Sequence, residues 1–372
     1  MNILYWLEGI WPQIGGIEQM ASKFMPAMQD RGFDFTLISN HDSGLPDHEQ
    51  VGGVDVYRFP CREALENQDF RELMRIRKEI ARIKRSFEPD LVHVNFSGPT
   101  ALIFNNLLAG TDTTPVLLAM RGMPLHDFER DSLLGKTLRS ADWTISVSEV
   151  VLRHLVEVVP EIKSRSSVIY NGQEIPELPP SPLSFDEPRL LCLGRLVSDK
   201  GFDLALTAFA ALVDKFPRAR MTIGGDGPLR SELERMASEL QIDHAVDFVG
   251  WVEPDDVPAV LNSATLVLLP SRNEGLPSVA VQAGLMGRPT VAARVAGLAE
   301  VVVDDETGLL IDPEDCHGLA DAITFLLRHP NIAEQMGRSA RARAGELFNF
   351  DSYIESHVRL YEKLGACAGA VR

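Results

Sequence analysis

The sequence predicts an α/β protein made of two halves, and three observations support this prediction. Short apolar runs alternate with longer stretches of helical period along the whole chain, which is the pattern of parallel strands joined by crossover helices. The length of 372 residues suits about two or three domains of roughly 100–200 residues each. A single proline-rich segment, at 176–182, separates the halves.

Seven segments of the first half are predicted to be strands. Most of them are almost uniformly apolar, as expected for strands that are covered on both faces of a sheet. A helical pattern follows nearly every one. The predicted strands are Asn2–Leu7, Asp34–Ser39, Val54–Phe59, Leu91–Asn95, Val116–Met120, Trp143–Val147 and Val168–Tyr170.

The helix predicted over residues 70–87 is amphipathic and basic. Leu73, Ile76, Ile80, Ile83 and Phe87 form its apolar stripe, and most of its other positions are Arg or Lys. Such a stripe is the usual sign of packing on a sheet, with the basic face solvated. A basic amphipathic helix can also lie on an anionic membrane. We favour the first interpretation and leave peripheral membrane contact through this helix open.

Between the halves lies Pro176-Glu177-Leu178-Pro179-Pro180-Ser181-Pro182, whose prolines can continue neither a helix nor a strand ladder. We therefore predict an N-terminal domain over 1–175, a linker over 176–184 and a C-terminal domain over 185–349. A further helical pattern occupies 350–372. The strands predicted after the linker are Arg189–Leu193, Arg220–Gly224, Val246–Val249, Leu266–Leu269, Thr290–Ala293 and Gly308–Ile311.

The charge and the cysteines exclude several classes of protein. The 36 Lys and Arg against 53 Asp and Glu give a net charge of −17, whereas nucleic-acid binding needs clustered cations, so no nucleic-acid partner is expected. The four cysteines lie far apart without metal-ligand spacing, which is typical of a reducing compartment. No apolar run approaches the roughly 18 residues of a membrane span, and the first residues lack a signal peptide's basic start. We expect a cytoplasmic protein, peripheral at the inner face of the membrane if it meets one.

The first predicted strand leads into a pair of glycines ahead of a helix. Gly15 and Gly16 would let the backbone approach a ligand and aim free N–H groups at an anion. A plain strand-to-helix turn uses the same residues, so the pair alone does not distinguish a phosphate site from a turn.

Cationic and glycine-rich turns follow the strands of the second half. Arg195 and Lys200 stand in a turn at the carboxyl edge of a buried strand, where open α/β sheets bind their ligands. Two cations there suit a pyrophosphate, although solvated loop cations would give the same pattern. The next such turn carries Gly225 and Gly227 and serves either a ligand or only the entry of a helix.

The turn after Leu266–Leu269 combines a carboxylate with a helix start. Glu274 follows the strand, Pro277 opens the helix, and the amides of Ser278 and Val279 come next. We expect these groups to surround a volume that could hold a sugar phosphate. An isolated Glu-Gly pair is more often a simple cap, so the prediction depends on the order of all the turns together.

Taken in order, these motifs resemble those of the retaining glycosyltransferases of family 4, which have the GT-B fold. The resemblance covers essentially the whole chain. It implies two facing Rossmann-like domains, of which the N-terminal one binds the acceptor and the C-terminal one holds most of the nucleotide sugar. It also implies a last helix that crosses back to the N-terminal domain. The matching motifs are Gly15-Gly16, Gly194-Arg195-Leu196, Asp199-Lys200-Gly201, Gly225-Asp226-Gly227-Pro228, Gly250-Trp251-Val252, Ser271-Arg272-Asn273-Glu274-Gly275, Gly287-Arg288-Pro289 and Thr307-Gly308-Leu309-Leu310.

The resemblance also implies roles for single residues. Arg195 and Lys200 would neutralise the donor pyrophosphate and the charge that develops on the leaving nucleoside diphosphate. Glu274 would accept hydrogen bonds from hydroxyls of the transferred sugar. No metal or other cofactor is expected, because protein cations take the metal's place. The other donor-binding residues implied are Gly15, Gly16, Gly225, Gly227, Val252, Leu276, Ser278, Val279 and Gln282.

Two positions depart from the family's pattern. Gln282 stands where a second carboxylate usually binds the ribose, and its amide oxygen can still accept a hydrogen bond, without charge assistance. Arg121 stands where many members carry a histidine, and an arginine cannot act as a general base. We place Arg121 and His126 on the acceptor side. His93, within a predicted strand, is interpreted as a hydrogen-bonded strand histidine rather than a catalyst.

The sequence thus predicts a metal-independent, retaining transferase that moves a hexose-type sugar from a UDP- or GDP-sugar to a hydroxyl of a glycan or lipid-linked acceptor. Two alternatives stay open. A nucleotide-sugar epimerase shares the fold but would need His and carboxylate groups for proton abstraction. A non-catalytic module that binds a nucleotide sugar and partners an active transferase would fit the departures at Gln282 and Arg121.

Overall fold

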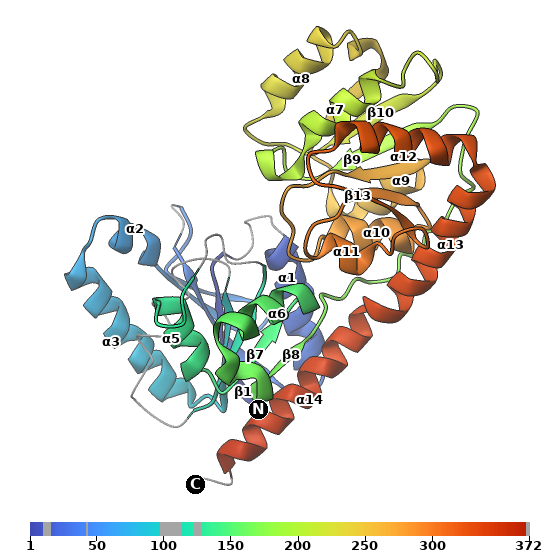
Figure 1. The fold of residues 1–372 in the computed structure, drawn as a ribbon. Helices are drawn as coiled ribbons and strands as arrows, with labels where there is room; N and C mark the ends of the chain where they lie inside the picture. Colours follow the sequence, from blue (N-terminus) through green and yellow to red (C-terminus); the bar gives the residue numbers. More distant parts are fainter. Residues whose placement is uncertain (10–15, 42–43, 97–113, 123–127, 370–372) are drawn as a thin grey trace. The chain divides into compact units, whose positions relative to one another are not determined.

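The computed structural model describes residues 1–9, 16–41, 44–96, 114–122 and 128–369, and it contains two compact α/β units. Unit 1 comprises Met1–Tyr170 together with Tyr353–Arg372, and unit 2 comprises Asn171–Ser352 (Figure 1). Each unit has its own sheet and its own buried apolar core. The predicted α/β class with two halves is confirmed.

Unit 1 is built on an eight-stranded sheet in the order β3-β4-β2-β1-β5-β6-β7-β8. All neighbouring strands are parallel except β3 and β4, which pair antiparallel. The innermost strands are almost wholly buried, which is why their sequences are continuous apolar runs. The strands are β1 (Asn2–Leu7), β2 (Asp34–Asn40), β3 (His48–Val51), β4 (Val54–Phe59), β5 (Leu91–Phe96), β6 (Val116–Met120), β7 (Trp143–Ser146) and β8 (Ser166–Val168).

Two strands at the edges of this sheet differ from the prediction. Strand β3 was not predicted, because its sequence His-Glu-Gln-Val is polar and only partly buried. The strand predicted at Val168–Tyr170 is wrong in position: β8 is Ser166–Val168, and Ser166 pairs with Thr144 of β7. An edge strand needs no apolar run, so apolar periodicity locates it poorly.

The α-helices described in unit 1 are α1 (Gly16–Gln29), α2 (Cys61–Glu66), α3 (Phe70–Phe87), α5 (Leu133–Ser140), α6 (Glu149–Val158) and most of α14 (Phe350–Gly369). The side chain of Asp69 caps α3 by accepting from the amides of Arg71 and Glu72, and left-handed Glu88 ends the helix. Ile76, Ile80 and Ile83 of the predicted apolar stripe are buried. The stripe therefore packs into the core of unit 1, as we favoured.

The C-terminal helix α14 returns to unit 1 from Tyr353 onward, as the resemblance implied (Figure 1). Tyr353 and Tyr361 pack edge-on against Phe24 and Phe33 respectively. Lys363 lies over the ring of Trp143, with its Nζ 3.7 Å from the ring centroid. These contacts join residues of α14 to a core made by the first part of the chain.

Unit 2 has a six-stranded, wholly parallel sheet in the order β11-β10-β9-β12-β13-β14. Its strands are β9 (Arg189–Leu193), β10 (Arg220–Gly224), β11 (Val246–Gly250), β12 (Leu266–Leu269), β13 (Thr290–Ala293) and β14 (Gly308–Ile311), close to the predicted ranges. Its helices are α7 (Phe202–Ala210), α8 (Arg230–Glu239), α9 (Val257–Asn262), α10 (Ser278–Leu285), α11 (Leu298–Val301), α12 (Cys316–Arg328) and α13 (Pro330–Leu347).

The proline-rich segment at 176–182 is held against unit 2. The backbone amide of Ser181 donates to Oδ1 of Asn262 at 2.7 Å, and Nδ2 of Asn262 donates to the carbonyl of Pro179 at 3.0 Å. Arg288 donates to the carbonyl of Ser181 as well. The segment contains no helix or strand, yet its backbone polar groups are tied down by side chains.

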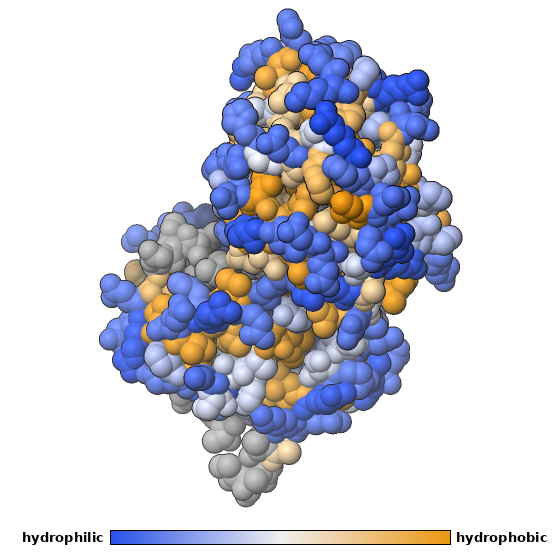
Figure 2. Space-filling model, turned by 45° about the vertical axis from the view of Figure 1, so that its right-hand side comes forward, coloured by the Kyte–Doolittle hydropathy of each residue, from blue (hydrophilic) through white to orange (hydrophobic). Residues whose placement is uncertain are grey.

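Hydrophilic side chains predominate on the face drawn in Figure 2, and apolar ones gather there in smaller groups. Among the described large apolar residues, Phe70 at the start of α3 is the most exposed, at 74%, and Met74 one turn later is 51% exposed. The start of α3 therefore carries apolar surface on the side that does not pack on the core.

Candidate active site

The loops that follow β9, β10 and β12 lie at one edge of the sheet of unit 2. The three strands are consecutive in the sheet and parallel, so their carboxyl ends meet at the same edge, which is where open α/β sheets bind ligands. Of the residues that the sequence predicted for the donor site, these loops carry Arg195, Lys200, Gly225, Gly227, Glu274 and Leu276.

Lys200 and Glu274 form an ion pair across two of these loops. Nζ of Lys200 lies 2.6 Å from Oε1 of Glu274, although the residues are 74 apart in sequence. The hydroxyl of Ser271 donates to the same oxygen at 2.9 Å. Glu274 is only 9% exposed, whereas the side chain of Lys200 is 30% exposed. The pair thus has a buried acidic end and a cationic end that solvent reaches.

Arg195 lies in the same loop as Lys200, directly after Gly194. Its side chain is exposed, and within the described residues its guanidinium forms no hydrogen bond or ion pair. An unpaired arginine at a strand end offers a planar fork of donors that matches a phosphate. The loop after β9 therefore presents one free cation and one cation held by a carboxylate.

Gly225 and Gly227 pack backbone to backbone against the loop of Arg195. Gly225 has φ +127°, and a Cβ there would lie 1.9 Å from the carbonyl oxygen of Gly194. A Cβ on Gly227 would lie 2.6 Å from the carbonyl oxygen of Leu196. Both glycines are thus required for the two loops to fit together, and whether their amides also meet a ligand stays a prediction.

The predicted residues around α10 lie next to Glu274 in the chain. The helix begins at Ser278 without a side-chain cap, and the first amides of an α-helix have no partner within the helix. Leu276, Ser278 and Val279 are partly exposed. Anions are stabilised at such a helix start.

Gln282 points its amide at another glutamine. Its Nε2 donates to Oε1 of Gln173 at 3.3 Å, and Gln173 is itself held by backbone hydrogen bonds to Phe348 and Phe350. This arrangement leaves the amide oxygen of Gln282 as the acceptor that the sequence predicted for a ribose hydroxyl. Val252 lies after β11, beside Gly224, where a Cβ would come within 3.2 Å of its Cγ2.

The sequence did not reveal that Arg272, in the loop after β12, is hydrogen-bonded to the loop after β9 that carries Lys200. Its guanidinium binds both carboxylate oxygens of Asp203, at 2.9 and 2.7 Å, and both of Glu314, at 2.6 and 3.1 Å. The guanidinium also donates to the carbonyl of Ser198 at 2.6 Å, and the backbone amide of Arg272 donates to the backbone carbonyl of Asp199 at 2.7 Å. We call Arg272, Asp203 and Glu314 the arginine clamp.

The hydrogen bonds of the arginine clamp shift the pKa values of Arg272 and Asp203. Hydrogen bonds to Asp203 and then to Glu314 raise the pKa of Arg272 above its already high value. Partial burial works to raise the pKa of Asp203, but the hydrogen bonds from Arg272 outweigh it and hold that pKa below its usual value. Arg272 and Asp203 therefore both stay charged at neutral pH, and the hydrogen bonds of Arg272 join the loop of Lys200 to that of Glu274.

Arg288, within one of the matching motifs, serves the fold. It is 1% exposed and donates to the carbonyls of Met286, Ala264, Asn262 and Ser181. Burial lowers its pKa to about 10. Its four carbonyl partners explain why an arginine is buried here without a carboxylate.

Of the four site residues predicted in the N-terminal half, the structure describes Gly16 and Arg121, both in unit 1. Gly15 and His126 lie outside the described residues, and Gly16 is the first residue of α1. Arg121 follows β6, and its Nε donates to Oδ1 of Asn95 at 2.7 Å. Asn95 in turn donates to the backbone carbonyl of Trp6 at 3.0 Å. The acceptor-side roles of Arg121 and His126 stay predictions.

His93 is buried within unit 1 rather than placed on its surface. Its Nδ1 lies 2.5 Å from the hydroxyl of Tyr361, and its ring stacks at 5.9 Å on that of His357 of α14. His357 makes its own hydrogen bond through Nδ1 to the carbonyl of Tyr353 at 2.9 Å. The Nε2 atoms of both histidines have no partner among the described residues. His93 is therefore a buried, hydrogen-bonded strand histidine, as we expected.

Burial determines the ionisation of this pair of histidines. It lowers the pKa of His357 to about 3 and that of His93 well below its usual 6.5, and the nearby cation Arg121 adds to both shifts. Both imidazoles are thus neutral at physiological pH.

In the described part of the chain, no group of three or more His, Cys, Asp or Glu side chains is placed to hold a metal ion. None of the helices described there is both long enough and apolar enough to cross a bilayer.

Two family models match adjoining parts of the chain. The model "Glycosyl transferases group 1" matches residues 175–343, and the model "Glycosyltransferase Family 4" matches residues 14–175. Together they cover both units, apart from the chain ends.

Several known proteins are similar to this chain. A GDP-mannose-dependent alpha-(1-6)-phosphatidylinositol monomannoside mannosyltransferase from Mycolicibacterium smegmatis is 34% identical over 42% of this chain and 43% of its own. The chain spans about half the length of the first curated relatives it matches, 47% and 55%.

Solved structures share the fold over nearly the full length. A sucrose-phosphate synthase from Thermosynechococcus elongatus has a TM-score of 0.83 at 22% identity, covering 98% of this chain and 99% of its own. Anabaena Alr3699/HepE, in complex with UDP, has a TM-score of 0.77 at 20% identity, covering 98% and 100%. The two Rossmann-like sheets and these neighbours confirm the GT-B fold, and the chain belongs to the family 4 glycosyltransferases.

Proposed function

We propose that this chain is a retaining, metal-independent glycosyltransferase that moves a hexose-type sugar from a UDP- or GDP-sugar to a hydroxyl of a glycan or lipid-linked acceptor. The observation that carries the proposal is the set of three side chains at one edge of unit 2. Arg195 is exposed and unpaired within the described residues, and Lys200 holds the buried carboxylate of Glu274 at 2.6 Å. Family membership supports the reaction class.

The two cations suit the departure of a nucleoside diphosphate. When the bond from sugar to phosphate breaks, negative charge develops on the leaving diphosphate, and fixed cations beside it stabilise the transition state more than the ground state. Arg195 and Lys200 provide two such charges from the protein itself. This is the basis for proposing that no metal ion is required.

Glu274 suits the recognition of the transferred sugar. Its Oε1 already accepts from Lys200 and Ser271, so Oε2 is the atom left to accept from sugar hydroxyls. The arginine clamp fixes the relative positions of the loops that carry Lys200 and Glu274. We propose that the sugar lies with its hydroxyls toward Glu274 and its phosphates toward Arg195 and Lys200.

The retaining course agrees with the side chains available. An inverting transferase needs a general base beside the acceptor hydroxyl. Of the described candidates in unit 1, Arg121 cannot serve as one and His93 is buried with Tyr361. In the retaining course that we propose, the leaving diphosphate takes up the acceptor proton on the face of the sugar from which it departs. The retained configuration therefore needs no protein base.

The remaining part of the proposal concerns location. We propose that the protein is cytoplasmic and binds peripherally, through residues 70–87, to the inner face of the membrane. Lipid-linked acceptors would be available at that face.

The test is the release of nucleoside diphosphate from a panel of UDP- and GDP-sugars, with glycan and lipid-linked acceptors, in the presence of EDTA. We expect turnover with one donor, a product with the donor's anomeric configuration by NMR, and a large loss in Lys200→Ala. A Lys215→Ala variant, which removes an exposed lysine elsewhere in unit 2, serves as the matched control. Turnover that depends on added metal, or an inverted product, would contradict the proposal.

The same assay separates the two alternatives. An epimerase would convert the donor's sugar without any acceptor, and a non-catalytic module would bind the donor and release nothing.

A further inference from the structure

We propose that α3 docks on a bilayer that contains anionic phospholipids, with Phe70 and Met74 inserted among the lipids and Arg71, Arg77, Lys78 and Arg85 bound to their phosphates. The inference deepens the peripheral contact proposed above, on which it rests, by naming the residues and the lipid class. It depends on unit 1 alone, so it can fail or succeed independently of the donor site of unit 2.

The apolar part of this surface is the pair Phe70 and Met74. These side chains are 74% and 51% exposed, and they lie one turn apart at the start of α3. On the core-facing side of the same helix, Ile76, Ile80 and Ile83 are buried. Packing in the core thus explains one apolar face of α3, and the second, smaller face is left exposed among the described residues.

The cationic part surrounds that pair. Arg71, Arg77, Lys78 and Arg85 are exposed, and within the described residues none of them forms an ion pair or a side-chain hydrogen bond. At 3.6 residues per turn, these four and the apolar pair fall within an arc of about 120° around the helix. Apolar side chains flanked by lysine and arginine are the composition of helices that lie in the plane of a membrane interface.

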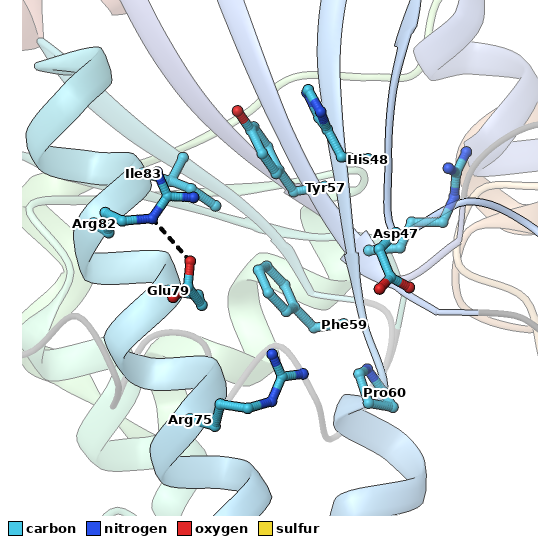
Figure 3. A pocket seen from close by; sticks show the side chains of 10 residues that line it. Asp47, His48, Tyr57, Phe59, Pro60, Arg75, Glu79, Arg82 and Ile83 are labelled. Atoms are coloured by element: carbon cyan, nitrogen blue, oxygen red, sulfur yellow. Dashed lines mark hydrogen bonds and ion pairs between the residues drawn. The ribbon is translucent and has the colours of Figure 1, made fainter.

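On the side of α3 that faces β4, the arginines are paired with glutamates, unlike those of the exposed arc. There, a groove of about 320 Å³ runs between α3 and the end of β4, with Tyr57 and Phe59 opposite Arg75, Glu79 and Arg82 (Figure 3). Arg75 binds Glu72 at 2.6 Å, and Arg82 binds Glu79 at 2.9 Å. The arginines that line the groove are therefore neutralised, and the unpaired cations lie on the outer arc.

The distribution of charge singles out α3 as the face that an anionic surface would attract. The helix contains seven Arg and Lys against two Glu, a charge of +5, within a chain of net charge −17. The rest of the chain, at −22, is repelled by the same surface. Charge complementarity thus favours an anionic bilayer as the partner and α3 as the face of unit 1 that contacts the bilayer.

The experiment is co-sedimentation of the full chain with vesicles of phosphatidylcholine alone or with about 30% phosphatidylglycerol, at low and high salt. We expect binding to the anionic vesicles only, weakened by salt. Arg71→Gln with Lys78→Gln should lower the partition coefficient by about 25-fold, since each cation near the surface contributes about fivefold. Phe70→Ser with Met74→Ser should lower it by about tenfold.

The matched control is Lys215→Gln with Arg218→Gln, which removes the same charge from exposed positions of unit 2 and should bind as the wild type does. The substituted side chains are exposed, and unchanged melting temperatures will verify folding. Failure of the wild type to bind anionic vesicles, or equal binding by all variants, overturns the proposal, and an acidic protein partner would then be the better occupant. A donor-induced thermal shift that persists in the α3 variants shows that the donor site is intact either way.

Discussion

Polar and ionisable side chains are used differently in the two units. In unit 2 they lie in loops at the carboxyl edge of the sheet, partly exposed and paired across loops, as Lys200 is with Glu274. In unit 1 such groups are buried where α14 packs on β5: His93 of β5 and His357 and Tyr361 of α14 are all essentially inaccessible. Two sheets of the same class thus support a site open to ligands in one unit and a sealed polar cluster in the other.

The difference shows what each arrangement can do. Loops at a strand end can exchange water for a ligand without disturbing the core, so unit 2 suits binding and group transfer. A buried cluster loses stability when its hydrogen bonds or its charge state change, so the cluster in unit 1 fixes the place of α14. Substitutions of the charged loop side chains of unit 2 should therefore affect mainly turnover, and those in the buried cluster should affect mainly stability.

The largest effect is expected from Lys200→Ala. If Lys200 faces the leaving diphosphate as we propose, its removal should lower the turnover of the donor by about 100- to 1000-fold, with little change in the folding of unit 1. Steady-state release of nucleoside diphosphate measures it, with Lys215→Ala as the control. Turnover within a factor of two of the wild type would remove Lys200 from the mechanism.

Gly225→Ala tests whether the loops of unit 2 need their close packing. The new Cβ would lie 1.9 Å from the carbonyl oxygen of Gly194 at φ +127°, so we expect a loss of about 2–3 kcal/mol in the free energy of unfolding of unit 2. Urea unfolding measures it. Gly345→Ala, in helix α13 with nothing within 4 Å of the new Cβ, should be neutral or stabilising by up to about 1 kcal/mol. Equal behaviour of the two variants would show that the loops do not pack as described.

Lowering the pH tests the buried cluster of unit 1. His357 has a pKa of about 3 when folded against 6.5 for an ordinary histidine, so the unfolded chain binds more protons between these values. Stability should therefore fall as the pH drops below about 6.5, by about 1.4 kcal/mol per unit for each buried histidine.

Chemical unfolding at pH 7.5, 6.5, 5.5 and 4.5, followed through the unfolding of unit 1, gives the slope. His357→Gln should flatten it, whereas His317→Gln, which replaces an exposed histidine of unit 2, should not. A slope unchanged by His357→Gln would mean that this histidine is not sealed in the folded protein.

The smallest effect is expected from Arg272→Met, which breaks the arginine clamp. Its ion pairs are partly exposed, with side-chain exposures of 29% for Arg272 and 41% for Asp203, so the loss of stability should stay below about 1 kcal/mol. Turnover should fall by about three- to tenfold because the loops of Lys200 and Glu274 lose their common tie.

Arg272→Lys should recover part of that turnover, and Arg235→Met, which breaks an exposed pair within α8, should leave it unchanged. A fall in stability with no fall in turnover would make the clamp purely structural.

Local patterns in the sequence predicted most of the fold. Apolar runs located the inner strands to within a residue, because those strands are buried on both faces, whereas β3 escaped notice because it is polar. The positions of Arg195, Lys200 and Glu274 followed from glycines and prolines within a few residues of them. The contacts between distant segments did not, since His93 meets Tyr361 across 268 residues and Arg272 meets Asp203 across 69.

The most direct test of the account is a thermal-shift titration of unit 2's candidate donor site with UDP, GDP, ADP and their sugar conjugates, in EDTA, on the full chain and on Lys200→Ala. The account predicts that one uridine or guanosine series stabilises the wild type, by about 2.7 kcal/mol at 100 times its dissociation constant, and that the shift is much weaker in the variant. No shift with any nucleotide, or a shift that EDTA abolishes, would contradict a metal-independent donor site built on Arg195, Lys200 and Glu274.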